Sequence, residues 1–262
     1  MLFLTTAPLW LVAVLLVGLT SLIAMIGPIV VRKRLSLEQL RTNNEVAGFK
    51  FATVGVIYAV LLGFAVIVVW EKFNEAENDV GLEAGAASTI YRLANGIQGE
   101  PGSAIRAGIT AYLQAAIAED WPAMKNGKGS AVATAALNNA YAALLRYEPD
   151  EKRGAAIFAE VLHQLDQVTQ ARRARIVVAA GIVPGIVWLV LFGGAFITIG
   201  FTFFFGTVNL RAQTMMTGAL SVLIFSALLV IIAIDHPFAG TVRVDTEPLA
   251  TVLADFAGLA KP

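Results

Sequence analysis

The sequence predicts an all-α, polytopic membrane protein with four transmembrane helices and a helical extramembrane bundle between spans two and three. Three observations predict this class. The chain is 57% apolar and 15% charged, with a mean hydropathy of +0.72, which is too apolar for a soluble globular protein. Several apolar runs are long enough to cross a hydrocarbon core about 30 Å thick. The charged stretch 71–175 shows helical periodicity.

Four apolar runs are expected to cross the membrane. They cover residues 9–31, 46–70, 176–205 and 215–234. The first run is expected to be a retained anchor and not a signal peptide, because no basic residue precedes it and no Ala-x-Ala site follows. The third is longer than one crossing requires, and two weak points predict that it is tilted, kinked or broken. These points are Gly181-x-x-Pro184-Gly185 and Gly193-Gly194.

The second span is expected to continue as one helix into water. No proline interrupts residues 46–94, and apolar residues spaced by three or four follow Trp70. They are Ala76, Val80, Ala84, Ala87, Tyr91 and Ala94. A single rod would then join the membrane part to the extramembrane part, and we expect the function to lie at this junction.

Four domains are expected along the chain. They are 1–70, with transmembrane helices 1 and 2 and a basic loop; 71–175, the extramembrane bundle; 176–234, with transmembrane helices 3 and 4; and 235–262, an extramembrane tail. The bundle is expected to hold four helices. The first continues the second span, and the others begin at Ser103, after the loop 126–130, and at Asp150.

Three local signals refine this arrangement. Ser36-x-x-Gln39 predicts a capping box that opens a short helix. The second bundle helix is expected to end at Asp120-Trp121-Pro122. In the tail, residues 242–244 are expected to be briefly extended, and a short amphipathic helix follows.

The distribution of basic residues predicts the orientation in a cell membrane. Five cations lie in and around the connector between the first two spans: Arg32, Lys33, Arg34, Arg41 and Lys50. The positive-inside rule places this connector in the cytoplasm, and the N-terminus and residues 71–175 on the non-cytoplasmic side. Three arginines count against this orientation, although a long domain can translocate despite them. They are Arg172, Arg173 and Arg175.

Motifs spread over nearly the whole chain resemble a bestrophin-like domain-of-unknown-function family of bacterial and plant membrane proteins. They are Tyr58-x-x-Leu61, Phe64, Trp70-x-x-Phe73, Ala76, Glu83-Ala84, Tyr91, Tyr112, Glu119-Asp120-Trp121, Pro184, Trp188, Asp235-His236-Pro237-Phe238, Gly240 and Pro248. The resemblance implies a distant likeness to bestrophins, which are pentameric ion channels whose second transmembrane helix lines a narrow apolar neck. The chain lacks the acidic cytosolic calcium clasp of animal bestrophins.

A homo-oligomeric ion channel is the first functional hypothesis, with the lipid bilayer and inorganic ions as partners. In a ring of subunits, the second span is the best candidate to line a pore, with an apolar constriction that gates by dewetting. The expected lining residues are Tyr58, Leu62, Ala65 and Val69. Glu71 and Glu75 would surround the mouth and attract ions, which favours cations. The alternative is that this face packs within one subunit and the acids are solvated.

A non-conducting membrane scaffold or sensor is the second hypothesis. Its extramembrane bundle would bind a partner protein or an envelope component through an exposed apolar or aromatic patch near Trp121. Asp235 and His236 are candidates for pH sensing, because histidine titrates near neutral pH; otherwise they end the fourth span and anchor it in the headgroups.

Other chemistry has little support in the sequence. Glu160-x-x-His163 has the spacing of carboxylate-bridged metal sites, but the further ligands are missing, so a solvated helix face is expected and no metal or cofactor. The absence of cysteine excludes thiol catalysis and cysteine-ligated metals. The net charge of zero argues against nucleic acid. No catalytic motif indicates an enzyme.

Overall fold

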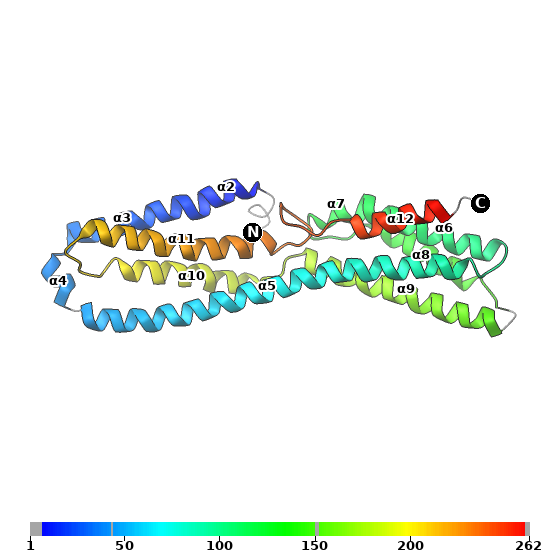
Figure 1. Ribbon diagram of the computed structural model, residues 1–262, viewed down its shortest axis with the longest axis horizontal. Coiled ribbons are helices and arrows are strands. Elements are labelled where there is room, and N and C mark those ends of the chain that lie inside the picture. The colour runs from blue at the N-terminus through cyan, green and yellow to red at the C-terminus, as the bar shows by residue number, and fades with distance from the viewer. Residues whose placement is uncertain (1–6, 43, 150–151, 260–262) are drawn as a thin grey trace. The chain divides into compact units, whose positions relative to one another are not determined.

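The computed structural model describes residues 7–42, 44–149 and 152–259, and every element of regular structure in these ranges is a helix (Figure 1). The chain forms two compact units. The membrane unit comprises Met1–Glu71 and Val183–Asp235, and the bundle unit comprises Lys72–Ile182 and His236–Pro262.

Four helices are long and apolar enough to cross a membrane, as the sequence predicts. They are Leu9–Arg34, Asn44–Ala94, Gly185–Thr202 and Leu210–Ile234. The first consists of α2 (Leu9–Ala13), a π-helical segment (Val14–Leu19) and α3 (Thr20–Arg34); the others are α5, α10 and α11. Within the membrane unit α11 packs against both α3 and α10 (Figure 1).

The predicted capping box is present at the start of α4 (Leu37–Thr42). The Ser36 backbone N–H donates to Gln39 Oε1 at 3.0 Å, and the Gln39 N–H donates to Ser36 Oγ at 3.3 Å. These two bonds satisfy donors that the first turn of a helix leaves without intrahelical partners.

The prediction of one continuous helix beyond Trp70 is confirmed. α5 (Asn44–Ala94) is helical without interruption between Val69 and Ala76. Its later turns bury small residues such as Ala76, Val80 and Ala87 in the bundle unit.

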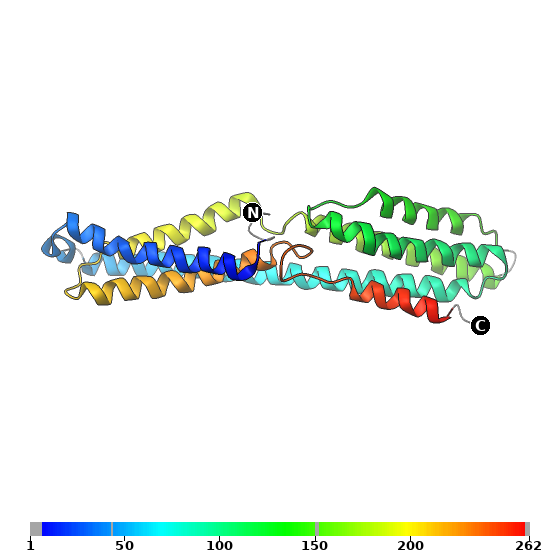
Figure 2. The same ribbon diagram turned by 90° about the horizontal axis from the view of Figure 1, so that it is seen from above.

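The bundle unit contains five further helices in the described residues. They are α6 (Glu100–Ala115), α7 (Trp121–Met124), α8 (Ala131–Leu145), α9 (Lys152–Ala179) and α12 (Glu247–Leu259). α8 packs on α6 and α9, and α12 lies along α6 and α5 (Figures 1 and 2).

One predicted boundary is wrong. The second bundle helix does not end at Pro122: a π-helical segment, Ala116–Asp120, leads directly into α7. The Trp121 N–H still donates across this π-helical turn to the Ala116 carbonyl, and Pro122 follows at the point where α7 begins. Residues 242–244 lie in a loop that the Val244 N–H closes by donating to the Pro237 carbonyl at 2.7 Å, and their brief extension stays a prediction.

The third span is broken at the first of its two weak points. α9 ends at Ala179 and α10 begins at Gly185, so the span starts later than the predicted Ile176. Gly181 has φ +111°, a conformation that side chains disfavour, and Pro184 precedes α10. Gly193 and Gly194 lie inside α10 without breaking it.

Candidate functional site

The face of α5 that carries the predicted pore-lining residues lies inside the subunit. Tyr58, Leu62 and Val69 are 5%, 9% and 1% exposed, and Ala65 is half-buried. The Tyr58 hydroxyl donates to the Leu191 carbonyl of α10 at 2.9 Å. This Tyr58 face therefore packs within one subunit, and it has little free surface with which to line a path between subunits.

A different face of α5 is free. Val60, Phe64 and Ile67 are 51%, 62% and 53% exposed, and their spacing of four and three continues with a spacing of four to Glu71. We call these four residues the Phe64 face. At 3.6 residues per turn Glu71 lies about 20° from Phe64 around the helix and about 140° from Tyr58. The sequence interpretation placed Glu71 at the end of the Tyr58 face, but the helical angle between these two residues puts them on different faces.

Both predicted mouth carboxylates are accessible to solvent or ions. Glu71 is exposed, and Glu75 lies one turn further along α5. The Lys72 ammonium donates to Glu75 Oε2 at 2.5 Å, but both side chains are about half exposed, so this surface ion pair constrains Glu75 weakly.

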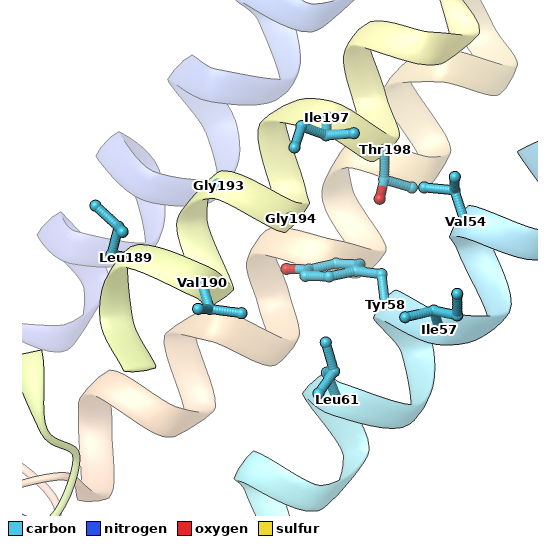
Figure 3. A pocket seen from close by; sticks show the side chains of 10 residues that line it. All are labelled: Val54, Ile57, Tyr58, Leu61, Leu189, Val190, Gly193, Gly194, Ile197 and Thr198. Carbon is cyan, nitrogen blue, oxygen red and sulfur yellow. The ribbon is translucent and has the colours of Figure 1, made fainter. Parts of the chain in front are cut away.

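An apolar groove of about 380 Å³ opens between α5 and α10 in the membrane unit (Figure 3). Val54, Ile57 and Leu61 line it from α5, and α10 contributes the opposite wall. The Tyr58 ring crosses beside Gly194, where an added Cβ would lie 2.4 Å from the ring, so only glycine permits this approach.

The bundle unit encloses a network of charged side chains that the sequence interpretation missed. Arg175 of α9 donates through Nε to Glu83 Oε2 at 2.6 Å and through Nη2 to Glu83 Oε1 at 3.0 Å. The same Nη2 donates to Asp120 Oδ2 at 3.0 Å. The Tyr112 hydroxyl donates to Glu83 Oε1 at 2.5 Å. The side chains of Glu83, Asp120 and Arg175 are fully buried.

Arg172 extends this network by one turn of α9. Its Nε and Nη2 donate to the two carboxylate oxygens of Asp120 at 2.8 and 3.1 Å, and Nη2 also donates to the Ser130 carbonyl. The guanidinium carbon of Arg175 lies 4.9 Å from the centre of the Trp121 ring. Two carboxylates and two guanidinium groups therefore balance in charge away from water, which burial of ions requires.

The network changes the ionisation of its members. Burial raises the pKa of the Tyr112 phenol well above its ordinary value, and the Glu83 charge raises it further. Burial also opposes ionisation of Asp120, but Arg172, Arg175 and the Ser130 N–H outweigh it and hold the pKa of that carboxyl below its usual value. Burial lowers the pKa of Arg175, but Glu83, Tyr112 and Asp120 together outweigh it, so the net pKa is raised. The Asp120 carboxyl and the Arg175 guanidinium therefore both stay charged at neutral pH.

Trp121 is not part of an exposed patch. It is buried, its ring meets Phe238 edge-on at 5.7 Å, and its Nε1 donates to the Val244 carbonyl at 3.4 Å. The partner-binding surface that a scaffold would need is therefore absent at this residue.

Asp235 and His236, the predicted pH-sensing pair, are both buried. Asp235 Oδ1 accepts a hydrogen bond of 2.8 Å from the Val183 backbone N–H, next to the break before α10. An added Cβ on Gly181 would lie 3.0 Å from His236 Nε2, so the glycine makes room for the imidazole. These contacts assign the pair a packing role, and a sensing role stays a prediction.

Glu160 and His163 lie on an exposed face of α9. Gln164 Nε2 donates to Glu160 at 2.7 Å, and Gln167 pairs with His163 at 3.0 Å. Among the described residues no cluster of three or more histidine, aspartate or glutamate side chains has the geometry to hold a metal ion.

Comparisons with known proteins identify the family and the fold. The bestrophin-like domain matches residues 14–249. A leucine-to-threonine variant of a bacterial bestrophin homologue from Klebsiella pneumoniae superposes with a TM-score of 0.74 at 14% identity, over 94% of this chain and 99% of that one.

Two further solved structures agree with this match. An isoleucine-to-threonine variant of the same homologue gives a TM-score of 0.70 at 15% identity, over 92% of this chain and 99% of its own. A membrane protein with a proline-to-alanine substitution gives 0.71 at 14%, over 94% and 99%. No curated protein matches the chain significantly. Because the domain match spans most of the sequence, this multi-pass membrane protein belongs to the bestrophin-like family.

Proposed function

We propose that the protein is a homo-oligomeric ion channel that favours cations, with α5 lining an apolar neck. Membership of the bestrophin-like family and the fold shared with a bacterial bestrophin homologue support this function. The observation that carries it is the Phe64 face, whose apolar side chains run in line into Glu71. We therefore propose Val60, Phe64 and Ile67 as the residues that line the neck, in place of Tyr58, Leu62, Ala65 and Val69.

The proposed mechanism separates gating from selection. A ring of Val60, Phe64 and Ile67 side chains offers no hydrogen bonds to water, so a narrow neck empties and blocks ions until it widens. Glu71 and Glu75, repeated by symmetry at the mouth, raise the local concentration of cations and repel anions.

Neutralising the mouth tests this proposal directly. In planar bilayers with a salt gradient, Glu71→Gln and Glu75→Gln are expected to move the reversal potential toward the anion side, because each removes one carboxylate per subunit. The effect is expected to shrink at high ionic strength, since exposed charges are then screened.

Glu77→Gln is the matched control, because Glu77 is also exposed on α5 but points about 120° away from Glu71. An equal shift in this variant would contradict selection by the Phe64 face. A folded, oligomeric wild-type protein that carries no current in any salt would overturn the channel itself.

We also propose that the loop around residues 32–50 is cytoplasmic and that the N-terminus and the 71–175 domain are outside. The five cations of the loop support this orientation. Two of the three contrary arginines, Arg172 and Arg175, belong to the buried network, so their position in the sequence before the third span has a structural reason independent of topology.

The natural absence of cysteine makes the orientation easy to measure. Single cysteines at the exposed positions Glu77 and Glu38 would be reacted with a membrane-impermeant maleimide in intact cells. Glu77→Cys is expected to react at once and Glu38→Cys only after permeabilisation. The reverse pattern would invert the proposed topology.

A further inference from the structure

The groove between α5 and α10 is lined by a threonine whose buried hydroxyl makes no hydrogen bond to the described residues of the subunit. Thr198 lines the groove (Figure 3), is only 3% exposed, and its Oγ1 has no hydrogen-bond partner among the described residues. Other threonines of the membrane unit donate to carbonyls of their own helix, as Thr53 does to Phe49 and Thr202 to Ile199. An unpaired hydroxyl in hydrocarbon is costly, so a partner from outside the subunit is expected.

The position of Thr198 indicates the depth of that partner. Thr198 lies one turn before α10 ends at Thr202, near the edge of the span. This end of α10 meets the start of α5, because Asn44 exchanges two hydrogen bonds of 2.8 and 2.9 Å with Gly206. From Thr198 the groove continues to Leu189, about 14 Å further into the membrane at 1.5 Å per residue.

A cation completes the sequence of groups along the groove. Lys50 precedes Val54 by one turn of α5, lies on the same side of that helix, and is exposed. From the edge of the membrane inward, the order is therefore an ammonium group, an unpaired hydroxyl and an apolar channel. A glycerophospholipid carries the complementary groups in the same order: phosphate, ester carbonyl and acyl chain.

We propose that this groove is a specific binding site for a glycerophospholipid. One acyl chain lies between α5 and α10, the Thr198 hydroxyl donates to the ester carbonyl, and the phosphate faces Lys50. The proposal does not depend on conduction, because its test measures labelling by a lipid and not current. A side chain from a second copy of the protein is the competing occupant, but an apolar side chain would leave both Lys50 and Thr198 unmatched.

Gly193 provides a variant that fills the groove without disturbing the subunit. A Cβ added there meets nothing within 4 Å although Gly193 lines the groove, so Gly193→Leu places its side chain in the space assigned to the acyl chain. Gly200→Leu is the matched control, since it is on the same helix, meets nothing within 4 Å and is outside the groove.

The test uses phosphatidylglycerol with a photoreactive diazirine on one acyl chain, in vesicles containing the intact protein. Labelling at Val190 and Ile197, which line the groove, is measured by mass spectrometry relative to Ile186, which is exposed on α10 outside it. Gly193→Leu is expected to lower this ratio about tenfold, because close packing leaves no room for both groups. Gly200→Leu is expected to leave it unchanged.

Two smaller substitutions test the site even if Gly193→Leu prevents the protein from folding. Thr198→Val keeps the shape and removes the hydroxyl, and it is expected to lower the ratio about threefold through loss of one hydrogen bond. Lys50→Gln is expected to abolish any preference for phosphatidylglycerol over phosphatidylcholine. Equal labelling ratios in wild type, Gly193→Leu and Thr198→Val would show only non-specific lipid contact. A cross-link between two protein copies at Val190 or Ile197 would assign the groove to a neighbouring subunit. Either result overturns the proposal.

Discussion

Arg175→Met is expected to lower the free energy of unfolding of the bundle unit by about 3–5 kcal/mol, the usual cost of removing one partner from a buried ion pair. Arg175 joins Glu83 to Asp120, and all three side chains are fully buried. Asp120 would keep Arg172, but Glu83 would retain only the Tyr112 hydroxyl. Thermal unfolding in detergent, followed by circular dichroism, measures the loss.

Arg173→Met is the control for this substitution, because Arg173 is on the same helix but exposed. Its expected effect is within about 0.5 kcal/mol. Adding Glu83→Gln to Arg175→Met should restore part of the stability, since it removes the uncompensated charge. Similar melting of the two single methionine variants would show that the network contributes little.

The same measurements should show acid sensitivity. Because the pKa of Asp120 is lowered in the folded protein, its charge stabilises the fold above the unfolded pKa of about 4. That contribution is present in full at neutral pH and is lost as the pH falls through the lowered value. Wild-type melting temperature is therefore expected to decline steeply only below about pH 4.

Asn74→Pro is expected to destabilise the protein by about 3 kcal/mol or more, because proline removes a helical hydrogen bond and clashes with the carbonyl four residues earlier. Position 74 lies inside α5, between its apolar turns and the turns that enter the bundle unit. Loss of helical circular dichroism, a lower melting temperature and new protease cleavage near this residue would all report the break.

The comparison variant is Asn74→Ala, which removes the same side chain but keeps the backbone donor and favours helix. It should melt at or above the wild-type temperature. If proline and alanine gave the same melting curve and the same protease resistance, the uninterrupted helix between Val69 and Ala76 would have no energetic importance.

The parts of the fold that depend on neighbouring residues were predictable from the sequence. The capping box at Ser36 and Gln39 needs only a three-residue spacing, and the continuity of α5 needs only periodicity without proline. The signal at Pro122 failed because the helix continues through a π-helical segment into α7 at this proline, and the sequence alone does not show that segment.

The parts that depend on distant partners were not predictable. Burial of Tyr58 follows from a carbonyl acceptor at Leu191, which is 133 positions away in the chain. In the sequence Glu83 looks like one more exposed acid on a charged helix. Its burial follows from a hydrogen-bonded ion pair with Arg175, which is 92 positions later in the chain. The apolar pattern of α5 gives no sign of which face another helix will cover, because every face of a membrane helix is apolar.

The bundle unit is assembled from two separate stretches of chain, with the whole of α10 and α11 between them. Residues of the second stretch cover aromatic groups of the first: Phe256 stacks on Tyr91 at 3.9 Å, and Phe238 meets Trp121. During synthesis these two rings therefore stay uncovered until residues 238–256 leave the ribosome, after the fourth span has been made. A nascent chain that stops before Pro237 is expected to be a substrate for proteolytic quality control, even with all of its membrane segments inserted.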